Sequence, residues 1–312
     1  MEKQVTLTSE VSINENVKTY MALTLAVLFW GMSFVGTKVA LESIPTFSLV
    51  FFRFLIAFVI LLALTPRFGL PTFSKKEHLR VFLIALFEPG LYFLFETAGL
   101  KYSSAPKVSL IIATIPIFVL IFATFFLGEK GRWIQVAGIL LSLVGIGILI
   151  VFDSAFSFSM EGSLFGDVLV FGAVFSAVFY IVGTRTLGMQ HSSFSITSMQ
   201  SFYGALFFLP FFLYDLPRVE WAAISPRSFI ALIYLTLFAT IGAFLSYNYA
   251  LTRIPASKAA VFINGIPVVT AFAAWFVLGE KLNAMQIMGA MLVLVAVYLS
   301  NYKPKLNVSD LN

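Results

Sequence analysis

Residues 100–144 read LKYSSAPKVSLIIATIPIFVLIFATFFLGEKGRWIQVAGILLSLV, and residues 251–295 read LTRIPASKAAVFINGIPVVTAFAAWFVLGEKLNAMQIMGAMLVLV. At this shift of 151 residues, 17 of the 45 positions are identical and no gap is needed. The identities include a proline, a glutamate and a glutamine, which a shared preference for Leu and Val does not explain. The chain is therefore predicted to contain a duplicated unit.

The composition is that of an integral membrane protein. Hydrophobic residues make up 60% of the chain, charged residues make up 11%, and the mean hydropathy is +0.96, whereas an ordinary soluble domain is about 25% charged. The chain has no cysteine, which excludes disulfides, thiol nucleophiles and thiolate metal sites. The two histidines, His78 and His191, lie at predicted loop edges. We therefore expect no metal site and no cofactor.

Ten hydrophobic runs are long enough to cross a bilayer, which takes about 20 residues. Pro, Gly and Asp residues typical of turns separate them. The predicted fold is all-α, with ten transmembrane helices joined mostly by short connections. The predicted helices cover residues 21–41, 47–64, 81–100, 105–127, 133–152, 167–187, 194–214, 229–250, 256–278 and 284–302.

Each half of the chain contains five of these helices. A second alignment, at a shift of 147, places Gly-Thr-Lys at 36–38 on Gly-Thr-Arg at 183–185. The predicted repeats are residues 21–152 and 167–302. Because each copy has an odd number of helices, the second copy must insert upside down, which gives a 5+5 inverted repeat.

Basic residues predict the orientation of the helices. With the amino end inside, 13 Lys and Arg residues lie on the cytoplasmic side and six lie on the other side. Both ends are therefore predicted to be cytoplasmic, as tails of residues 1–20 and 303–312. The first tail lacks the apolar core of a signal peptide and is expected to be retained.

Together these features resemble a known family. The doubled five-helix unit, Pro116 of the fourth helix, and the Leu-Gly-Glu that ends the fourth and ninth helices are similar to the EamA branch of the drug/metabolite transporter superfamily. The resemblance covers about residues 20–302. It implies a basket-like bundle with a central cavity lined by helices 1, 3, 4, 6, 8 and 9. It also implies export of amino acids or other metabolites, with sugar or nucleotide-sugar transport in distant branches.

The third predicted helix carries two acids, Glu88 and Glu96, about two turns apart on nearly the same face. Glu88 lies near mid-span, where an unpaired charge costs about 2.5 to 3.5 kcal/mol. It is interpreted as a cavity group that binds a cation or carries a proton, or as a structural acid that hydrogen-bonds backbone freed by Pro89 and Gly90. Tyr92, one turn further on, is a second candidate for the cavity.

Arg53 is the basic residue that lies well inside a predicted span. It is about 9 Å from the outer end of the second helix, at a depth comparable with that of Glu96. We predict that the two side chains pair, directly or through water, as a gating or structural contact. The alternative is that Arg53 extends outward to the membrane surface.

Further aromatic and polar side chains complete the expected cavity. Trp30 and Ser33 lie mid-helix, and Tyr180 corresponds to Ser33 in the second repeat. Trp30 is expected to stack on a planar or cationic substrate, with core packing as the alternative. Thr114 and Asn264 precede prolines at matched midpoints, where broken helices point to a binding site. A kink needed only for packing is the other interpretation.

The repeated Leu-Gly-Glu-Lys is interpreted as part of the fold. Gly128 and Gly279 are predicted to end their helices as left-handed caps. Glu129 and Glu280 are predicted to bind the first amides of the fifth and tenth helices.

The sequence thus predicts a secondary transporter or facilitator for a small metabolite, such as an amino acid or amine, in a plasma or inner membrane. Its expected partners are the substrate and the lipid bilayer, without nucleic acid, and the expected assembly is a monomer or homodimer. Glu88 makes proton coupling an open question. No Gly-Lys-Ser/Thr phosphate loop and no HExxH helix occur, so neither ATP-driven transport nor an enzyme is expected. The alternatives are an intramembrane enzyme, a lipid-handling protein, or a sugar or nucleotide-type carrier.

Overall fold

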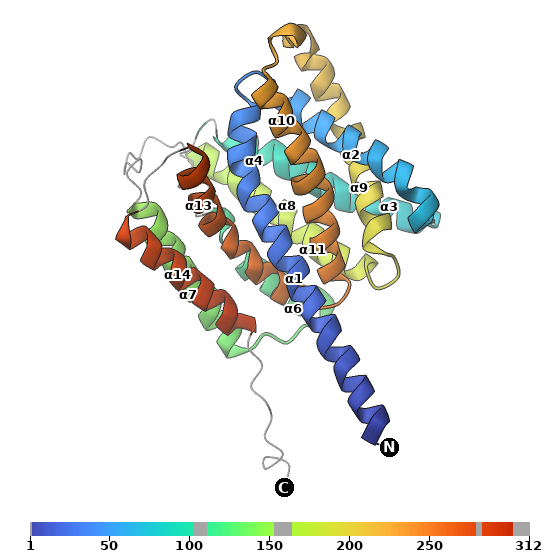
Figure 1. Ribbon diagram of the computed structural model, residues 1–312, viewed down its shortest axis with the longest axis vertical. Helices are drawn as coiled ribbons and strands as arrows, with labels where there is room; N and C mark the ends of the chain where they lie inside the picture. Colours follow the sequence, from blue (N-terminus) through green and yellow to red (C-terminus); the bar gives the residue numbers. More distant parts are fainter. Residues whose placement is uncertain (1, 101, 103–110, 153–163, 279–282, 302–312) are drawn as a thin grey trace.

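The computed structural model describes residues 2–100, 102, 111–152, 164–278 and 283–301. Within these ranges the chain is helical and contains no β-strand (Figure 1). The elements are α1 (Glu2–Ala40), α2 (Thr46–Phe68), α3 (Lys75–Ala85), η1 (Leu86–Leu91), α4 (Tyr92–Leu100), α6 (Ile115–Leu127), α7 (Trp133–Val151), α8 (Leu164–Leu187), α9 (Ser193–Asp215), η2 (Leu216–Arg218), η3 (Trp221–Ala223), α10 (Pro226–Tyr234), η4 (Leu235–Gly242), α11 (Ala243–Leu251), α12 (Ala256–Val261), η5 (Phe262–Gly265), α13 (Ile266–Leu278) and α14 (Ala284–Asn301).

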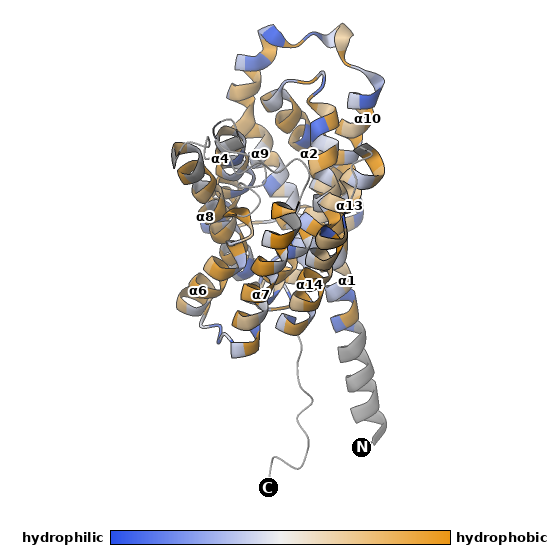
Figure 2. Cartoon of the chain, turned by 90° about the vertical axis from the view of Figure 1, so that its left-hand side faces the viewer, coloured by the Kyte–Doolittle hydropathy of each residue, from blue (hydrophilic) through white to orange (hydrophobic). Residues whose placement is uncertain are grey.

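Eight helices in the described part of the chain are long and apolar enough to cross a membrane. Hydrophobic colour covers most of their length in Figure 2, and hydrophilic colour collects in the connections at the two ends. The other two predicted spans, 105–127 and 133–152, contain the shorter apolar helices Ile115–Leu127 and Trp133–Ile148. The chain is therefore a multi-pass, all-helical membrane protein.

The first helix begins earlier than predicted. The sequence places the first span at 21–41, but α1 begins at Glu2 and its apolar portion at Glu15. The reason is local, because no proline or glycine occurs before Gly31 to interrupt the helix. Part of the predicted amino-terminal tail is therefore helical.

Three of the long helices are interrupted. Residues 75–100 form α3, the π-helical turn η1 and α4, and residues 226–251 form α10, the π-helical η4 and α11. A 3₁₀ turn, η5, separates α12 from α13. Turns of this kind inside a helix are uncommon and often lie at functional sites. At the shift of 151 residues, η1 (86–91) falls on positions 237–242, within η4.

The helices that pack against one another come from both halves of the chain. α7 and α14 lie side by side at one edge of the bundle (Figure 1), and α2 lies against α9. α1 packs against α10, η4, α11 and α13, while α8 packs against α3, η1, α4 and α6. The core is thus formed between the halves rather than within each half.

Glycines on α7 allow a close approach to α14. A Cβ atom added at Gly145 would lie 2.8 Å from the carbonyl oxygen of Gly289 and 3.0 Å from the amide nitrogen of Val293. These are backbone atoms, which cannot rotate away. Gly147, two residues later on the same helix, has open space around it.

We expect Gly145→Val to separate α7 from α14 and to destabilise the protein by about 1 to 3 kcal/mol, the usual cost of overpacking. Gly147→Val introduces the same β-branched side chain without a clash and is the matched control. Thermal unfolding in detergent measures the difference. Equal melting temperatures for the two variants would contradict this account of the contact.

Candidate functional site

Five buried polar residues from α8, α9 and α11 form what we call the polar cluster: Tyr180, Thr197, Gln200, Tyr247 and Asn248. None of them is more than 1% exposed. The Tyr180 hydroxyl donates a hydrogen bond to Oδ1 of Asn248 at 2.9 Å. The Asn248 amide donates to Oγ1 of Thr197 at 2.9 Å and to Oε1 of Gln200 at 2.7 Å. Asn248 therefore joins three helices through one side chain.

The cluster continues to the interruption at η1. Nε2 of Gln200 donates to the backbone carbonyl of Glu88 at 3.3 Å. Glu88 has φ −142° and ψ 116°, outside the helical region, and the following Pro89 has no N–H to offer. The carbonyl of Glu88, at the residue where the helix is broken, thus accepts a hydrogen bond from a side chain of the other half of the chain.

The side chain of Glu88 lies beside the same cluster. Glu88 is 9% exposed, and its backbone carbonyl is bound by Gln200 of the cluster. No hydrogen bond to the carboxyl group of Glu88 is present within the described ranges. In this part of the chain, the side chain that hydrogen-bonds the backbone at the break is therefore that of Gln200 and not that of Glu88.

An aromatic wall adjoins the polar cluster. Trp30 on α1 lies with its ring centroid 5.1 Å from that of Tyr247 and 5.5 Å from that of Phe244. Its Nε1 donates to the carbonyl of Ala239 in η4 at 3.2 Å. Ala239 corresponds to Glu88 at the shift of 151 residues. The two π-helical interruptions thus have corresponding carbonyls, and each accepts a hydrogen bond from the opposite half.

The hydroxyl of Tyr247 is buried and has no hydrogen-bond partner in the described part of the chain. A buried polar group without a partner is uncommon and calls for an explanation. The hydroxyl belongs to a residue that contacts Trp30 and Tyr180. A ligand group at this position would satisfy it.

Arg53 lies on α2 next to the second interruption. Its Nε donates to Oγ1 of Thr240 in η4 at 3.2 Å, and its guanidinium lies 5.3 Å from the ring centroid of Phe93. Arg53 and Glu96 interact electrostatically, but no direct ion pair joins them among the residues described. With 4% of its surface exposed, Arg53 does not extend to the membrane surface.

Other predicted site residues do not join the polar cluster through hydrogen bonds. The hydroxyls of Ser33 and Thr114 donate to carbonyls of their own helical turns, at 2.7 Å and 2.6 Å. The Asn264 amide donates to Oγ of Ser142 on α7 at 2.5 Å. Tyr92 packs edge-on against Phe93. The prediction that these residues bind substrate stays a prediction.

The predicted caps have mixed outcomes. Gly128 adopts the left-handed conformation, with φ 65°, at the end of α6. Glu129 does not bind the start of α7 as predicted, because its carboxylate accepts the amides of Ala256 and Ser257 at the start of α12. The fold brings that helix start closer than the sequence suggests. Gly279 and Glu280 lie outside the described residues.

Sequence reasoning missed part of the site. Thr197 and Gln200 are polar residues within apolar spans, as Tyr247 and Asn248 also are, and that signal alone could have marked them as part of the site. No group of three His, Asp or Glu side chains close enough to hold a metal ion occurs in the described ranges. The arrangement suits recognition of a small polar molecule rather than covalent chemistry.

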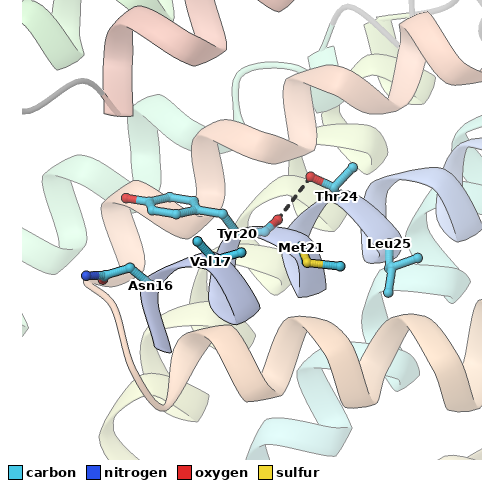
Figure 3. A pocket seen from close by; sticks show the side chains of 6 residues that line it. All are labelled: Asn16, Val17, Tyr20, Met21, Thr24 and Leu25. Carbon is cyan, nitrogen blue, oxygen red and sulfur yellow. Dashed lines mark hydrogen bonds between the residues drawn. The ribbon is translucent and has the colours of Figure 1, made fainter. Parts of the chain in front are cut away.

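A groove of about 540 Å³ lies elsewhere, along α1 (Figure 3). Its described lining is mostly apolar and includes Val17, Tyr20, Met21 and Leu25. Val17 and Met21 are exposed on the bundle surface, where lipid would cover them. This groove is separate from the polar cluster.

The model of the EamA-like transporter family matches the chain twice, at residues 17–151 and 164–302. The chain belongs to the EamA-like transporter family. Together the two matches cover nearly the whole chain, and each contains one of the predicted repeats almost completely. The resemblance predicted from the sequence is confirmed.

Relatives along the whole length are named as transporters. An uncharacterized transporter of Archaeoglobus fulgidus is 31% identical, over 92% of this chain and 99% of its own. Transporter YetK of Bacillus subtilis is 27% identical, over 95% and 90% of the two chains. A probable terminal-alkyne amino-acid exporter of Streptantibioticus cattleyicolor is 25% identical, over 91% and 93%.

A crystal structure of a protein 17% identical in sequence superimposes with a TM-score of 0.77, covering 91% of this chain and 96% of that one. At this identity the likeness concerns the fold alone. The whole EamA-like chain therefore adopts a fold already seen in a solved structure.

Replacing Asn248 with Leu, a side chain of similar size, removes three hydrogen bonds and leaves polar groups of three neighbours buried. Each buried group left without a partner costs about 1 to 3 kcal/mol. We expect Asn248→Leu to lower the melting temperature in detergent much more than Tyr180→Phe, which removes one of the three bonds. A larger effect of Tyr180→Phe would show that Asn248 is not the centre of the network.

Proposed function

We propose that this EamA-like protein is a secondary transporter or facilitator that moves a small metabolite across a plasma or inner membrane, in the export direction. The observation that carries the proposal is the polar cluster with its aromatic wall, buried among helices from both halves beside two interrupted helices. Interrupted helices at matched positions are typical of transporter binding sites.

The proposed architecture is ten transmembrane helices arranged as a 5+5 inverted repeat around the site. The double match to the family model supports the duplication. Contacts between distant connections support the topology, because each joins two connections on the same predicted side of the membrane. Inside, the pairs are Glu77–His191, Glu129–Ala256 and Glu15–Arg253; outside, they are Phe47–Asp215, Ser43–Ser225 and Phe152–Asn283.

Alternating access follows from this arrangement. Two oppositely oriented halves can exchange conformations at similar energy, so each side of the membrane can be opened in turn. With ten helices in total both termini lie on the same side of the membrane, and the excess of basic residues on that side favours the cytoplasm. Arg53 is buried and binds Thr240 of η4, the residue after Ala239, whose carbonyl Trp30 binds.

The proposed substrate is an amino acid, an amine or a related compound. The acid Glu88 offers a partner for an ammonium group, the Trp30 ring offers a surface for a cation, and the Tyr247 hydroxyl is free among the described residues. One relative is named a probable exporter of a terminal-alkyne amino acid. A zwitterion would find both a buried acid and the buried base Arg53 in this region.

Uptake into proteoliposomes tests the site. We expect Trp30→Ala and Glu88→Gln to reduce saturable uptake of an amino-acid or amine panel at least tenfold, because each removes a group proposed to contact the substrate. Trp133→Ala and Glu42→Gln are matched controls, since both residues are exposed. Unchanged uptake in both site variants would reject the site assignment.

Proton coupling through Glu88 has its own test. An imposed pH gradient should drive uptake in the wild-type protein, and Glu88→Gln should abolish that dependence because glutamine cannot exchange a proton. Counterflow of labelled substrate without a gradient separates coupling from binding. A pH-gradient dependence that survives in Glu88→Gln would reject coupling through this acid.

A further inference from the structure

Glu129 makes a three-bond contact between two distant parts of the chain. Its carboxylate accepts hydrogen bonds from the Ala256 amide at 2.7 Å, the Ser257 amide at 3.0 Å and the Ser257 hydroxyl at 2.6 Å. All three donors lie at the start of α12, 127 or 128 residues away. We call Glu129, Ala256 and Ser257 the Glu129 latch.

The latch joins one half of the chain to the other. Glu129 follows the end of α6 in the first half, while Ala256 begins α12 in the second half. A carboxylate at a helix start interacts favourably with the helix dipole as well as with the amides. Breaking this contact would leave the first amides of α12 without these acceptors. The contact therefore stabilises one specific position of α12 against α6.

α12 is a short helix with a hinge position at each end. It has six residues, begins after Pro255, and is separated from α13 by the 3₁₀ turn η5. Proline and 3₁₀ turns within a span are common hinge positions. Beyond the latch, Ala260 on α12 and Ala123 on α6 are fully buried. The latch thus holds α12 against the end of α6, next to these buried residues, at the end of the bundle that is predicted to face the cytoplasm.

At the corresponding positions of the repeat the sequence supplies different residues. At the shift of 151 residues, Glu129 corresponds to Glu280, and Ala256 and Ser257 correspond to Ala105 and Pro106. These three positions lie outside the described residues, so only their chemistry is compared. Proline has neither an N–H nor a hydroxyl group. A corresponding contact would therefore lack two of the three donors.

We propose that Glu129 is the gate residue of the cytoplasmic end, and that its contact with α12 favours a resting state closed to the cytoplasm. The inference rests on the proposed alternating-access function. It assigns to Glu129 a role in positioning α12 and no contact with substrate. The charge-assisted bonds of the latch are stronger than neutral ones, so their loss shifts the resting population toward the state open inside.

The absence of cysteine from the chain permits a direct test. Ala260→Cys and, separately, Ala123→Cys serve as single reporters, labelled with a membrane-impermeant thiol reagent in inside-out and right-side-out vesicles. In each background, Glu129→Gln removes the charge and replaces one acceptor oxygen with a donor. Ser257→Ala removes only the hydroxyl bond. Asp215→Asn is the control, because Asp215 binds the Phe47 and Ser48 amides at the start of α2.

We expect Glu129→Gln to raise labelling from the cytoplasmic side about tenfold, the population change for about 1.4 kcal/mol, with a smaller rise in Ser257→Ala. Asp215→Asn should leave cytoplasmic labelling unchanged. Unchanged labelling in both latch variants of a protein that transports would overturn the gate. Labelling does not depend on substrate, so a protein that responds in this assay yet transports nothing would overturn the proposed function instead.

Discussion

Backbone groups that lose their helical partners inside a bilayer cannot turn to water, and this constraint organises the structure. Each unsatisfied group in hydrocarbon costs several kcal/mol. The chain nevertheless interrupts its helices at η1, η4 and η5. Gln200 binds the freed carbonyl in η1, and Trp30 binds the corresponding carbonyl in η4. The interruptions are stable because side chains from the opposite half complete them, and that requirement holds the two halves together at the site.

Two of the three interruptions were predictable from the sequence, whereas η4 and the partners of the breaks were not. Pro89 and Gly90 mark the break in the third predicted helix, and Pro267 marks the break in the ninth, because proline acts locally. The partners depend on how each helix is rotated and tilted. Asn264 and Asn248 are both fully buried asparagines of the second half, yet one amide faces α7 and the other joins the polar cluster. No local signal separates them.

Glu129 shows the same limit at a helix end. The sequence predicted that Glu129 binds the first amides of α7, because these amides follow it within a few residues. Tertiary structure instead brings the start of α12 to the carboxylate and offers a hydroxyl as well as two amides. A contact across 127 residues depends on the packing of whole helices. The sequence therefore predicted the all-helical membrane class and, through the repeated motif, the family, and its predictions were weakest for long-range polar contacts.

The duplicated unit has charged and aromatic side chains that occur in one copy only. At the shift of 147, Arg53 corresponds to Gln200 and Trp30 to Ala177, and at the shift of 151, Glu88 corresponds to Ala239. Symmetric side chains would make the two sides of the site alike. With an acid, a base and an indole in one half only, a bound molecule meets different groups on its two sides. Under the proposed function, the repeated backbone would allow two conformations of similar energy, while the unrepeated side chains would determine both what is bound and which conformation is preferred.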